Sequence, residues 1–403
     1  MKKSKRWWIA VAGVLLQMAL GAVYAWSVFR IPLAKQFHWS ISQVTLAFTI
    51  AIMSLGFASF FGGLWLKKVG PRVVALTGGL LYGGGVFLAS YSYHGLWWLY
   101  MTYGLIGGTG LGLSYIVPIS VLVKWFPDHR GLMTGVAVGG FGAGALITAP
   151  IATRLIQSVG VLQTFEFLGI AYLLVSVLSG YFMQNPPEDW QPQGLKNNKK
   201  QLVKEHAGDF TLGRALKTWQ WWSLWLLLFL NTSAGITIIS QEAPMFQELV
   251  KATAIVAAGM IGIVSIGNAL GRVFWAWTSD LLGRRATFTI MFIVQIGLFW
   301  ILPGLHSVTS VTIFAFLILM CYGGGFGTMP AFVADYFGST NLGSIYGLIL
   351  TAWGFASAFG PLLIAHMRQS SGAYTSGLHI IAIVMAVSII LPLVVRPPVR
   401  HKT

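Results

Sequence analysis

The sequence predicts an all-α membrane protein whose twelve transmembrane helices form two related halves of six helices each. Three observations support this fold class. Of the 403 residues, 56% are hydrophobic and only 9% are charged, whereas an average soluble domain is about 25% charged. Apolar stretches of spanning length recur along the chain, and one long polar stretch divides them into two sets of six. A water-soluble protein of this composition could not cover its own surface, so lipid is the expected solvent.

Each predicted span holds the roughly 20 apolar residues that a helix needs to cross a hydrocarbon core about 30 Å thick. The spans of the first half, residues 1–184, lie near residues 7–30, 44–66, 72–92, 96–122, 131–154 and 162–184. A cytoplasmic linker at residues 185–218 follows, and it is rich in Pro, Gln, Asn and Lys. The spans of the second half, residues 219–403, lie near residues 219–240, 255–280, 286–303, 308–333, 342–368 and 374–395.

The net charge of +16 is concentrated in alternate connections between the spans. If successive helices alternate in direction, most basic residues fall on one face, and the opposite face carries only Arg30, Lys35, Arg154, Lys251 and Arg368. The positive-inside rule then places both termini in the cytoplasm and makes the chain a multi-pass protein of the cytoplasmic (inner) membrane. This placement also argues against a nucleic-acid partner.

Two connections between spans carry related motifs. The one after the second span reads Lys67-Lys68-Val69-Gly70-Pro71-Arg72, and the one after the eighth reads Asp280-Leu281-Leu282-Gly283-Arg284-Arg285. The two halves repeat one another at an offset of roughly 210 residues, and many secondary transporters are built from such repeats.

These two loops resemble the signature loop of the major facilitator superfamily, and the resemblance covers the whole chain. It implies a major facilitator fold in which the acid and the basic residues around the Gly turn form ion pairs that break when the halves rock. The residues concerned are Asp280, Gly283, Arg284, Arg285, Gly70 and Arg72. The alternative is that the basic residues only set topology, but that role requires no acid such as Asp280.

Three shorter motifs narrow the resemblance. They are residues 21–26 (GAVYAW), residues 124–131 (KWFPDHRG), and Gly271-Arg272 ahead of Ser279-Asp280. They resemble the branch of the superfamily that contains the oxalate:formate antiporter and the monocarboxylate transporters. The resemblance implies a carrier of a small organic anion that works by alternating access, with its site between the halves near the midplane. It implies no cofactor and no obligate protein partner.

Arg272 is the candidate anion-binding residue. It lies eight residues before Asp280, and therefore about 12 Å along its helix toward the midplane. A charge at that depth costs at least about 2.5–3.5 kcal/mol, so it must face a cavity or a partner. Its planar fork matches a carboxylate. A structural arginine is the alternative, but the residue one turn earlier is Asn268 rather than an acid. In the resembling branch the arginine at this position binds the substrate carboxylate.

Aromatic residues of the same spans are expected to shape the site around Arg272. By the resemblance, an aromatic box would contain Tyr24, Trp26, Tyr115, Phe141, Tyr322 and Phe326. A tyrosine hydroxyl can donate a hydrogen bond to a carboxylate while its ring lines an apolar slot. Ser114 and Asn268 are further hydrogen-bonding candidates. Because aromatic residues make up 14% of the chain, core packing or contact with lipid is the favoured alternative for each of them taken alone.

Two departures from the resembling carriers bear on the substrate. Trp353 occupies the position where the oxalate carrier has a second cation, a lysine, and one fixed cation favours an anion with one negative charge. The animal monocarboxylate carriers have an acid and a lysine where Asn268 and Val28 stand here. Proton coupling would therefore need another acid, and Glu242 and Glu166 are the candidates. An interfacial, structurally paired carboxylate is the alternative for both, because each is expected about one turn from the outer surface.

Other chemistry is not indicated. The single cysteine, Cys321, lies inside a predicted span, no Walker A motif is present, and the histidines show no metal-binding spacing. An enzyme is therefore not expected. The sequence favours proton-linked symport of a monocarboxylate such as lactate or pyruvate. Carboxylate exchange of the oxalate:formate type and export of another small molecule are the alternatives, and a membrane sensor would require a signalling domain.

Overall fold

The computed structural model of the protein describes residues 4–126, 130–187, 210–338 and 341–398. Within these residues, twelve helical stretches are long and apolar enough to cross a membrane, which confirms the predicted number. They lie on either side of the predicted linker, of which residues 188–209 are outside the described part.

The first half contains six spans, some of them built from more than one helical segment. Its elements are α1 (Ser4–Gly21), the 3₁₀-helix η1 (Ala22–Trp26), α2 (Ser27–Phe37), α3 (Ile41–Val69), α4 (Pro71–Leu88), the 3₁₀-helix η2 (Ala89–His94), α5 (Leu96–Leu99), the π-helix η3 (Tyr100–Gly107), α6 (Gly108–Trp125), α7 (Arg130–Gly142), α8 (Gly144–Val159) and α9 (Val161–Tyr181).

The second half repeats this arrangement after a short helix. Its elements are α11 (Leu212–Leu216), α12 (Trp219–Leu249), α13 (Ala254–Leu282), α14 (Arg284–Ile301), the 3₁₀-helix η4 (Leu302–Gly304), α15 (Val308–Phe337), α16 (Leu342–Ile349), α17 (Thr351–Ser371), α18 (Thr375–Ser388) and α19 (Ile390–Val394).

Local sequence explains where several helices begin and end. Ser40, Thr218 and Thr253 precede α3, α12 and α13, and each side-chain oxygen accepts a hydrogen bond from the backbone N–H three residues later. Gly70 and Gly283 close α3 and α13 with φ of +85° and +86°, a conformation that glycine adopts without strain.

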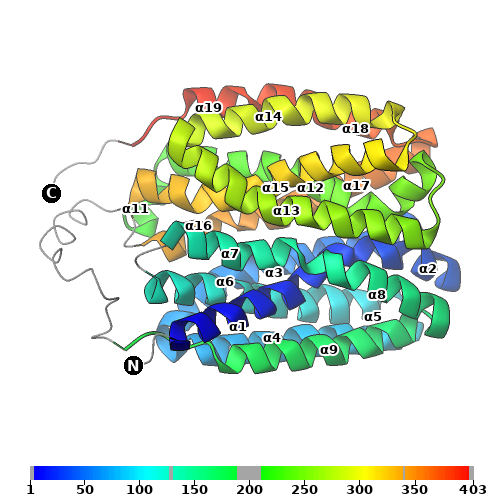
Figure 1. The fold of residues 1–403 in the computed structure, drawn as a ribbon, viewed down its shortest axis with the longest axis horizontal. Helices are drawn as coiled ribbons and strands as arrows, with labels where there is room; N and C mark the ends of the chain where they lie inside the picture. The colour runs from blue at the N-terminus through cyan, green and yellow to red at the C-terminus, as the bar shows by residue number, and fades with distance from the viewer. Residues whose placement is uncertain (1–3, 127–129, 188–209, 339–340, 399–403) are drawn as a thin grey trace, which may run out of the picture.

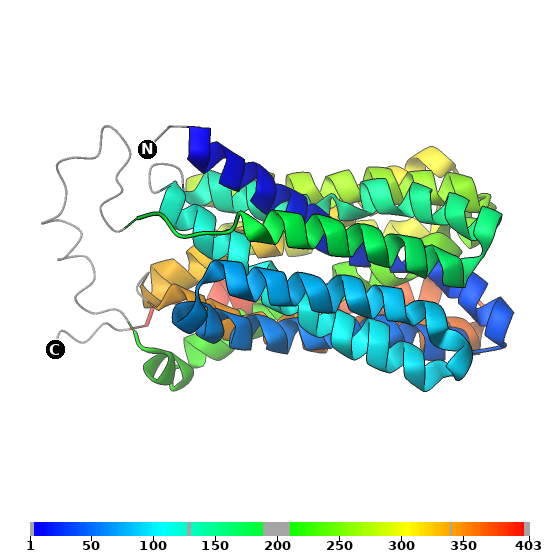
Figure 2. The ribbon, with the colours of Figure 1, turned by 90° about the horizontal axis from the view of Figure 1, so that it is seen from below.

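The helices run roughly along the long axis of the molecule, and the two halves form two lobes (Figure 1). Figure 2 shows helices of the first half lying side by side along this axis. α1 begins and α19 ends at the same end of the bundle, which we call the terminal end; we call the opposite end the far end. The lobes meet where α13 packs against α7 and α8, and where α17 packs against α3.

Proline positions confirm the internal repeat. Three prolines lie inside helices of the first half, and each has a counterpart in the second half 211 or 212 residues later. The pairs are Pro32 and Pro244, Pro118 and Pro330, and Pro150 and Pro361. A proline inside a helix removes one backbone hydrogen bond and bends the helix. The two halves are therefore interrupted at equivalent levels.

Two spans continue well beyond their predicted ends. The first continues to Phe37 instead of residue 30, and the seventh continues to Leu249 instead of residue 240. In both spans, a charged residue that would normally mark the end of an apolar stretch is instead buried inside the bundle. Arg30, assigned from the sequence to the outer face, is 0% exposed, and Glu242 is 3% exposed. Arg30 and Glu242 are therefore buried between helices, and each lies seven residues before the end of its span.

Glycines bring α13 and α15 unusually close together. A β-carbon at Gly271 would collide with the backbone of Met320, and one at Gly327 would collide with the backbone of Arg272. Small residues at such positions let membrane helices pack backbone against backbone. The close contact holds Arg272 on α13 in a fixed relation to Tyr322 and Phe326 on α15.

Candidate functional site

Most of the predicted site residues converge between the halves, midway along the bundle. They come from η1, α6 and α7 of the first half and from α13, α15 and α17 of the second half. Each is at most 2% exposed: Tyr24, Tyr115, Phe141, Arg272, Tyr322, Phe326 and Trp353. We refer to these seven residues as the central cluster. Because both halves contribute, motion of one half against the other would rearrange it.

Arg272 is the charged member of the central cluster. Its guanidinium carbon lies 4.9 Å from the centre of the Phe326 ring and 5.7 Å from that of Phe141, which are cation–π distances. Nε donates a hydrogen bond to Oδ1 of Asn268, 3.3 Å away. Nη1 and Nη2 are buried and make no hydrogen bond of standard geometry with the described residues. No ion pair joins Arg272 to a carboxylate in the described part of the chain.

Three tyrosine hydroxyls lie around this guanidinium. Arg272 interacts electrostatically with Tyr24, Tyr115 and Tyr322. The hydroxyls of Tyr24 and Tyr322 are 2.7 Å apart and hydrogen-bonded, which joins the first half to the second. The hydroxyl of Tyr115 is buried without a hydrogen bond of standard geometry to the described residues. Arg272 also makes side-chain hydrogen-bond interactions with Tyr115 and Tyr24 that fall short of standard geometry. The guanidinium therefore meets neutral hydroxyls where a carboxylate would bind more strongly.

Aromatic rings enclose these polar groups. The ring centre of Trp353 lies 4.7 Å from that of Phe326 and 5.6 Å from those of Tyr115 and Phe141. Tyr24 packs edge-on against Phe141 at 5.1 Å. Trp353 Nε1 is also buried without a partner among the residues described. The rings therefore surround several hydrogen-bond donors and, among the described residues, no carboxylate. This combination suits a small anion.

A small cavity adjoins the central cluster. It is lined by Tyr24, Ala145, Ile239, Glu242, Ser265, Asn268 and Leu319 and has a volume of about 10 Å³, roughly enough for one water molecule. A carboxylate would therefore fit only after the halves move apart. Glu242 reaches this cavity because α12 continues past residue 240. Glu166, in contrast, is exposed on α9 and does not join the site.

A second candidate, Ser114, also lies away from the site, and the structure adds a residue that was not a candidate. Ser114 Oγ donates a hydrogen bond to the Ala75 carbonyl oxygen, 3.3 Å away on α4, so it faces the interior of the first half. Tyr346 on α16 is 4% exposed and interacts electrostatically with Tyr115 and Arg272. Its place on the same span as Trp353 was the only sequence signal for it.

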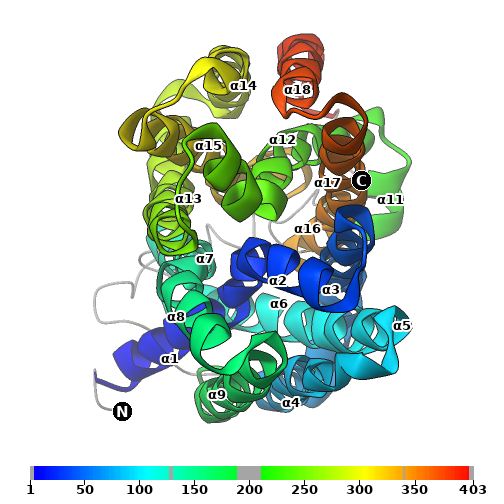
Figure 3. The same ribbon diagram turned by 90° about the vertical axis from the view of Figure 1, so that its right-hand side faces the viewer.

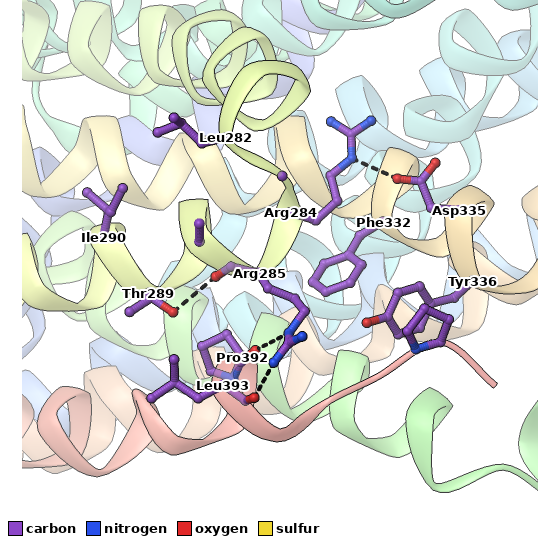
Figure 4. A pocket seen from close by; sticks show the side chains of 13 residues that line it. Leu282, Arg284, Arg285, Thr289, Ile290, Phe332, Asp335, Tyr336, Pro392 and Leu393 are labelled. Atoms are coloured by element: carbon purple, nitrogen blue, oxygen red, sulfur yellow. Dashed lines mark hydrogen bonds and ion pairs between the residues drawn. The ribbon is translucent and has the colours of Figure 1, made fainter.

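The signature-loop residues of the second half lie at the connection between α13 and α14, and Figure 4 shows Arg284 and Arg285 among the side chains that line a pocket there. Arg284 forms ion pairs with Asp280 at 2.6 Å and Asp335 at 2.9 Å. Arg285 donates hydrogen bonds to the carbonyl oxygens of Pro392, at 2.8 Å, and of Leu393. Arg284, Arg285 and Asp335 line a cleft of about 780 Å³ together with Pro392 and Leu393.

The described ion pairs of Arg284 join helices of one half. Asp280, Arg284 and Asp335 belong to α13, α14 and α15, all within the second half. In this conformation Arg284 therefore links three helices of the same half. In the first-half loop, Gly70 makes the matching turn, and the guanidinium of Arg72 lies 4.6 Å from the ring centre of Tyr181, again within one half.

Comparison with known proteins agrees with this architecture. The family model of the Major Facilitator Superfamily matches residues 9–329 and, in a second match, residues 252–403. The oxalate:formate antiporter of Oxalobacter formigenes is 29% identical over 378 residues, covering 92% of this chain and 87% of its own. Monocarboxylate transporter 13 of Rattus norvegicus is 26% identical over 390 residues, covering 92% of this chain and 84% of its own.

A solved structure supports the fold. A bacterial homologue of the human lysosomal transporter Spinster, in an inward-facing and unoccupied conformation, superposes with a TM-score of 0.69. The alignment covers 98% of this chain and 96% of that one, at 14% sequence identity. At this identity the similarity concerns the fold alone.

Proposed function

The chain belongs to the Major Facilitator Superfamily, and from this we propose that it carries a small monocarboxylate, of the lactate or pyruvate type, across the inner membrane. Transport proceeds by alternating access, as the halves part first at one end of the central cluster and then at the other. Proton-linked symport is the proposed mode. The positive-inside asymmetry supports a cytoplasmic terminal end, so that the far end faces outward.

Unsatisfied donors at Arg272 carry this proposal. Nη1 and Nη2 are buried without a carboxylate partner, and the neutral hydroxyls of Tyr115 and Tyr24 are poorly aligned hydrogen-bond partners beside them. A carboxylate could accept two parallel hydrogen bonds from the guanidinium and a third from the tyrosine. Burying an unpaired cation is costly, so the site is electrostatically complete only with an anion bound.

The charge of the central cluster favours monocarboxylates. Arg272 is its one cationic member, and Trp353 fills the position of the second cation in the resembling oxalate carrier. A dicarboxylate would leave one of its charges among aromatic rings without a counter-charge, and burying such a charge is unfavourable.

Glu242 is the proposed proton carrier. Its side chain lines the cavity that Asn268 also lines, and Asn268 contacts Arg272. An ionised Glu242 could offset the charge of Arg272 while the site is empty, and protonation would remove that negative charge when a carboxylate binds. One proton would then accompany each anion.

Carboxylate exchange is the second candidate, and one observation favours it. Arg272 has no ion-pair partner in the described part of the chain. If Glu242 does not offset its charge, the empty carrier must occlude a lone cation before it can return, and this raises the barrier to an empty return. Only loaded carriers would then cycle.

Uptake by proteoliposomes tests the proposed function. We expect radiolabelled lactate or pyruvate to accumulate under an inward acid gradient, with less uptake of formate and little of oxalate. Protein-free liposomes and liposomes with Arg272→Gln protein serve as controls. Accumulation of oxalate ahead of every monocarboxylate, or no uptake of any carboxylate above the controls, would contradict the proposal.

A change at Trp353 tests the valence argument. Replacing Trp353 with Lys adds a second cation to the central cluster, so the affinity for oxalate should rise relative to that for lactate, by about tenfold or more. Competition of each acid against labelled lactate measures this ratio. Trp225→Lys, on α12 and half-buried, is a control for the added charge. An unchanged ratio in folded Trp353→Lys protein would show that this position does not face the anion.

A further inference from the structure

A second buried arginine lies between the central cluster and the far end. Arg30 on α2 is 0% exposed. Its Nη1 donates hydrogen bonds to the carbonyl oxygen of Ser240, 2.9 Å away, and to Oε1 of Gln241, both on α12 of the other half. Nε and Nη2 are buried and make no hydrogen bond with the described residues. Arg30 is therefore a cation whose described hydrogen-bond acceptors are neutral. They engage only Nη1 of its guanidinium.

No carboxylate offsets this charge in the part of the chain that the structure describes. Glu242 follows Gln241 directly, but it lines the cavity beside Asn268. The hydroxyl of Tyr374, 3.3 Å from the same Gln241 Oε1, is the other polar group in this network. Like Arg272, Arg30 thus has donors that suit an anion and no anion among its neighbours.

The internal repeat shows that Arg30 lies close to the pseudo-two-fold axis. Arg30 is two residues before Pro32, and Glu242 is two residues before Pro244, the repeat partner of Pro32. The contact of Arg30 with Ser240 and Gln241 therefore joins nearly equivalent positions of the two halves. Equivalent positions can touch only next to the axis that relates them.

In carriers built from two such halves, this axis is normal to the membrane and the substrate site lies at the interface between the halves. Viewed from the far end, α2 lies close to the middle of the bundle, between the two lobes (Figure 3). Arg30 is thus placed on the route between Arg272 and the solution at the far end.

We propose that Arg30 is a second anion-binding residue, which takes the substrate carboxylate between the far-end solution and Arg272. This inference rests on the proposed function. When the halves part at the far end, the hydrogen bonds from Arg30 to Ser240 and Gln241 break. The N–H groups of its guanidinium then face the opening. The anion then offers stronger, charge-assisted hydrogen bonds in place of those that broke. When the halves close, Ser240 and Gln241 replace the anion as it moves on to Arg272.

Half-saturating lactate concentrations, measured separately at the two faces with right-side-out and inverted membrane vesicles, test this inference. Arg30→Gln should raise the far-end value about tenfold, because a charge-assisted contact is lost, and should leave the terminal-end value within about twofold. Gln241→Ala removes the closing contact but keeps the cation, so its far-end value should stay unchanged or fall. Lys35→Gln, which removes an exposed charge from the same helix, is the matched control.

If Arg30 served only to hold the halves closed, the half-saturating lactate concentration at the far end would change in the opposite direction. Loss of the contact would then favour the conformation open at the far end, so both Arg30→Gln and Gln241→Ala would lower the far-end value; that result would overturn the inference. If Arg30→Gln does not fold, Arg30→Lys replaces it in the experiment. A half-saturating lactate concentration at the far end equal to that of the parent protein, at both low and high salt, would also overturn the inference. Absence of lactate uptake in the parent would instead refute the proposed function.

Discussion

Replacing Arg272 with lysine is expected to remove most of the carboxylate-induced thermal stabilisation of the protein while leaving the folded protein intact. Lysine keeps the positive charge but cannot present two parallel N–H groups to a carboxylate. Hydrogen bonds to a charged group contribute about 1.5–3 kcal/mol each. Loss of one of them corresponds to binding about tenfold to a hundredfold weaker. The shift of the melting temperature with added lactate or pyruvate measures the effect in detergent.

A matched substitution separates binding from stability. Arg368 forms an ion pair with Glu248 at 2.6 Å near the far end and is partly exposed, so Arg368→Lys makes the same chemical change away from the central cluster. Its lactate-induced shift should equal that of the parent protein. If Arg272→Lys also kept the full shift, Arg272 would not bind the carboxylate, and the proposed site would have to be abandoned.

Replacing Glu242 with glutamine is expected to abolish the effect of a pH gradient on uptake while sparing lactate exchange between the two faces. Glutamine resembles the protonated carboxyl in shape and charge, so the variant should behave as if it always carried its proton. The loaded carrier then still crosses, but the charge of Arg272 in the empty site is no longer offset. Uptake of labelled lactate into empty vesicles under an inward acid gradient should fall to the level seen without a gradient.

Glu166→Gln provides the control for this experiment. Glu166 was an equal candidate in the sequence, but it is exposed on α9 and does not line the cavity beside Asn268. Its replacement should leave the pH-driven uptake unchanged. If uptake by the parent protein occurs only in vesicles preloaded with carboxylate and ignores the pH gradient, carboxylate exchange replaces symport as the proposed mode.

Several features of this protein could be predicted because they depend on composition along the chain. The number of spans follows from the length of the apolar stretches, and the division into halves follows from the polar linker. Arg272 was recognisable because a charge in the middle of an apolar stretch needs a specific reason. The central cluster followed from the resemblance to known carriers.

The remaining features depend on which side of a helix faces inward and on where a helix ends. Arg30 lies at the border of an apolar stretch, where a charge normally indicates a connection, and only the continuation of the helix to Phe37 buries it. Ser114 follows the same helix as Tyr115 but points toward α4. The ion pairs of Arg284 could be anticipated from the motif, but their confinement to one half required the positions of three helices.

The close packing of α13 against α15 has a consequence for the energetics of a complete transport cycle. The glycines at this contact bring the backbones of α13 and α15 together beside Arg272, Tyr322 and Phe326. If the two helices move as one unit during transport, an anion bound to that unit keeps the same contacts whichever face is open. Their contribution to the binding free energy is therefore common to the outward-open and inward-open states and cancels from the difference between them. Any inequality of affinity between the two faces must then arise in the first half, from residues that approach the anion in only one of the two states.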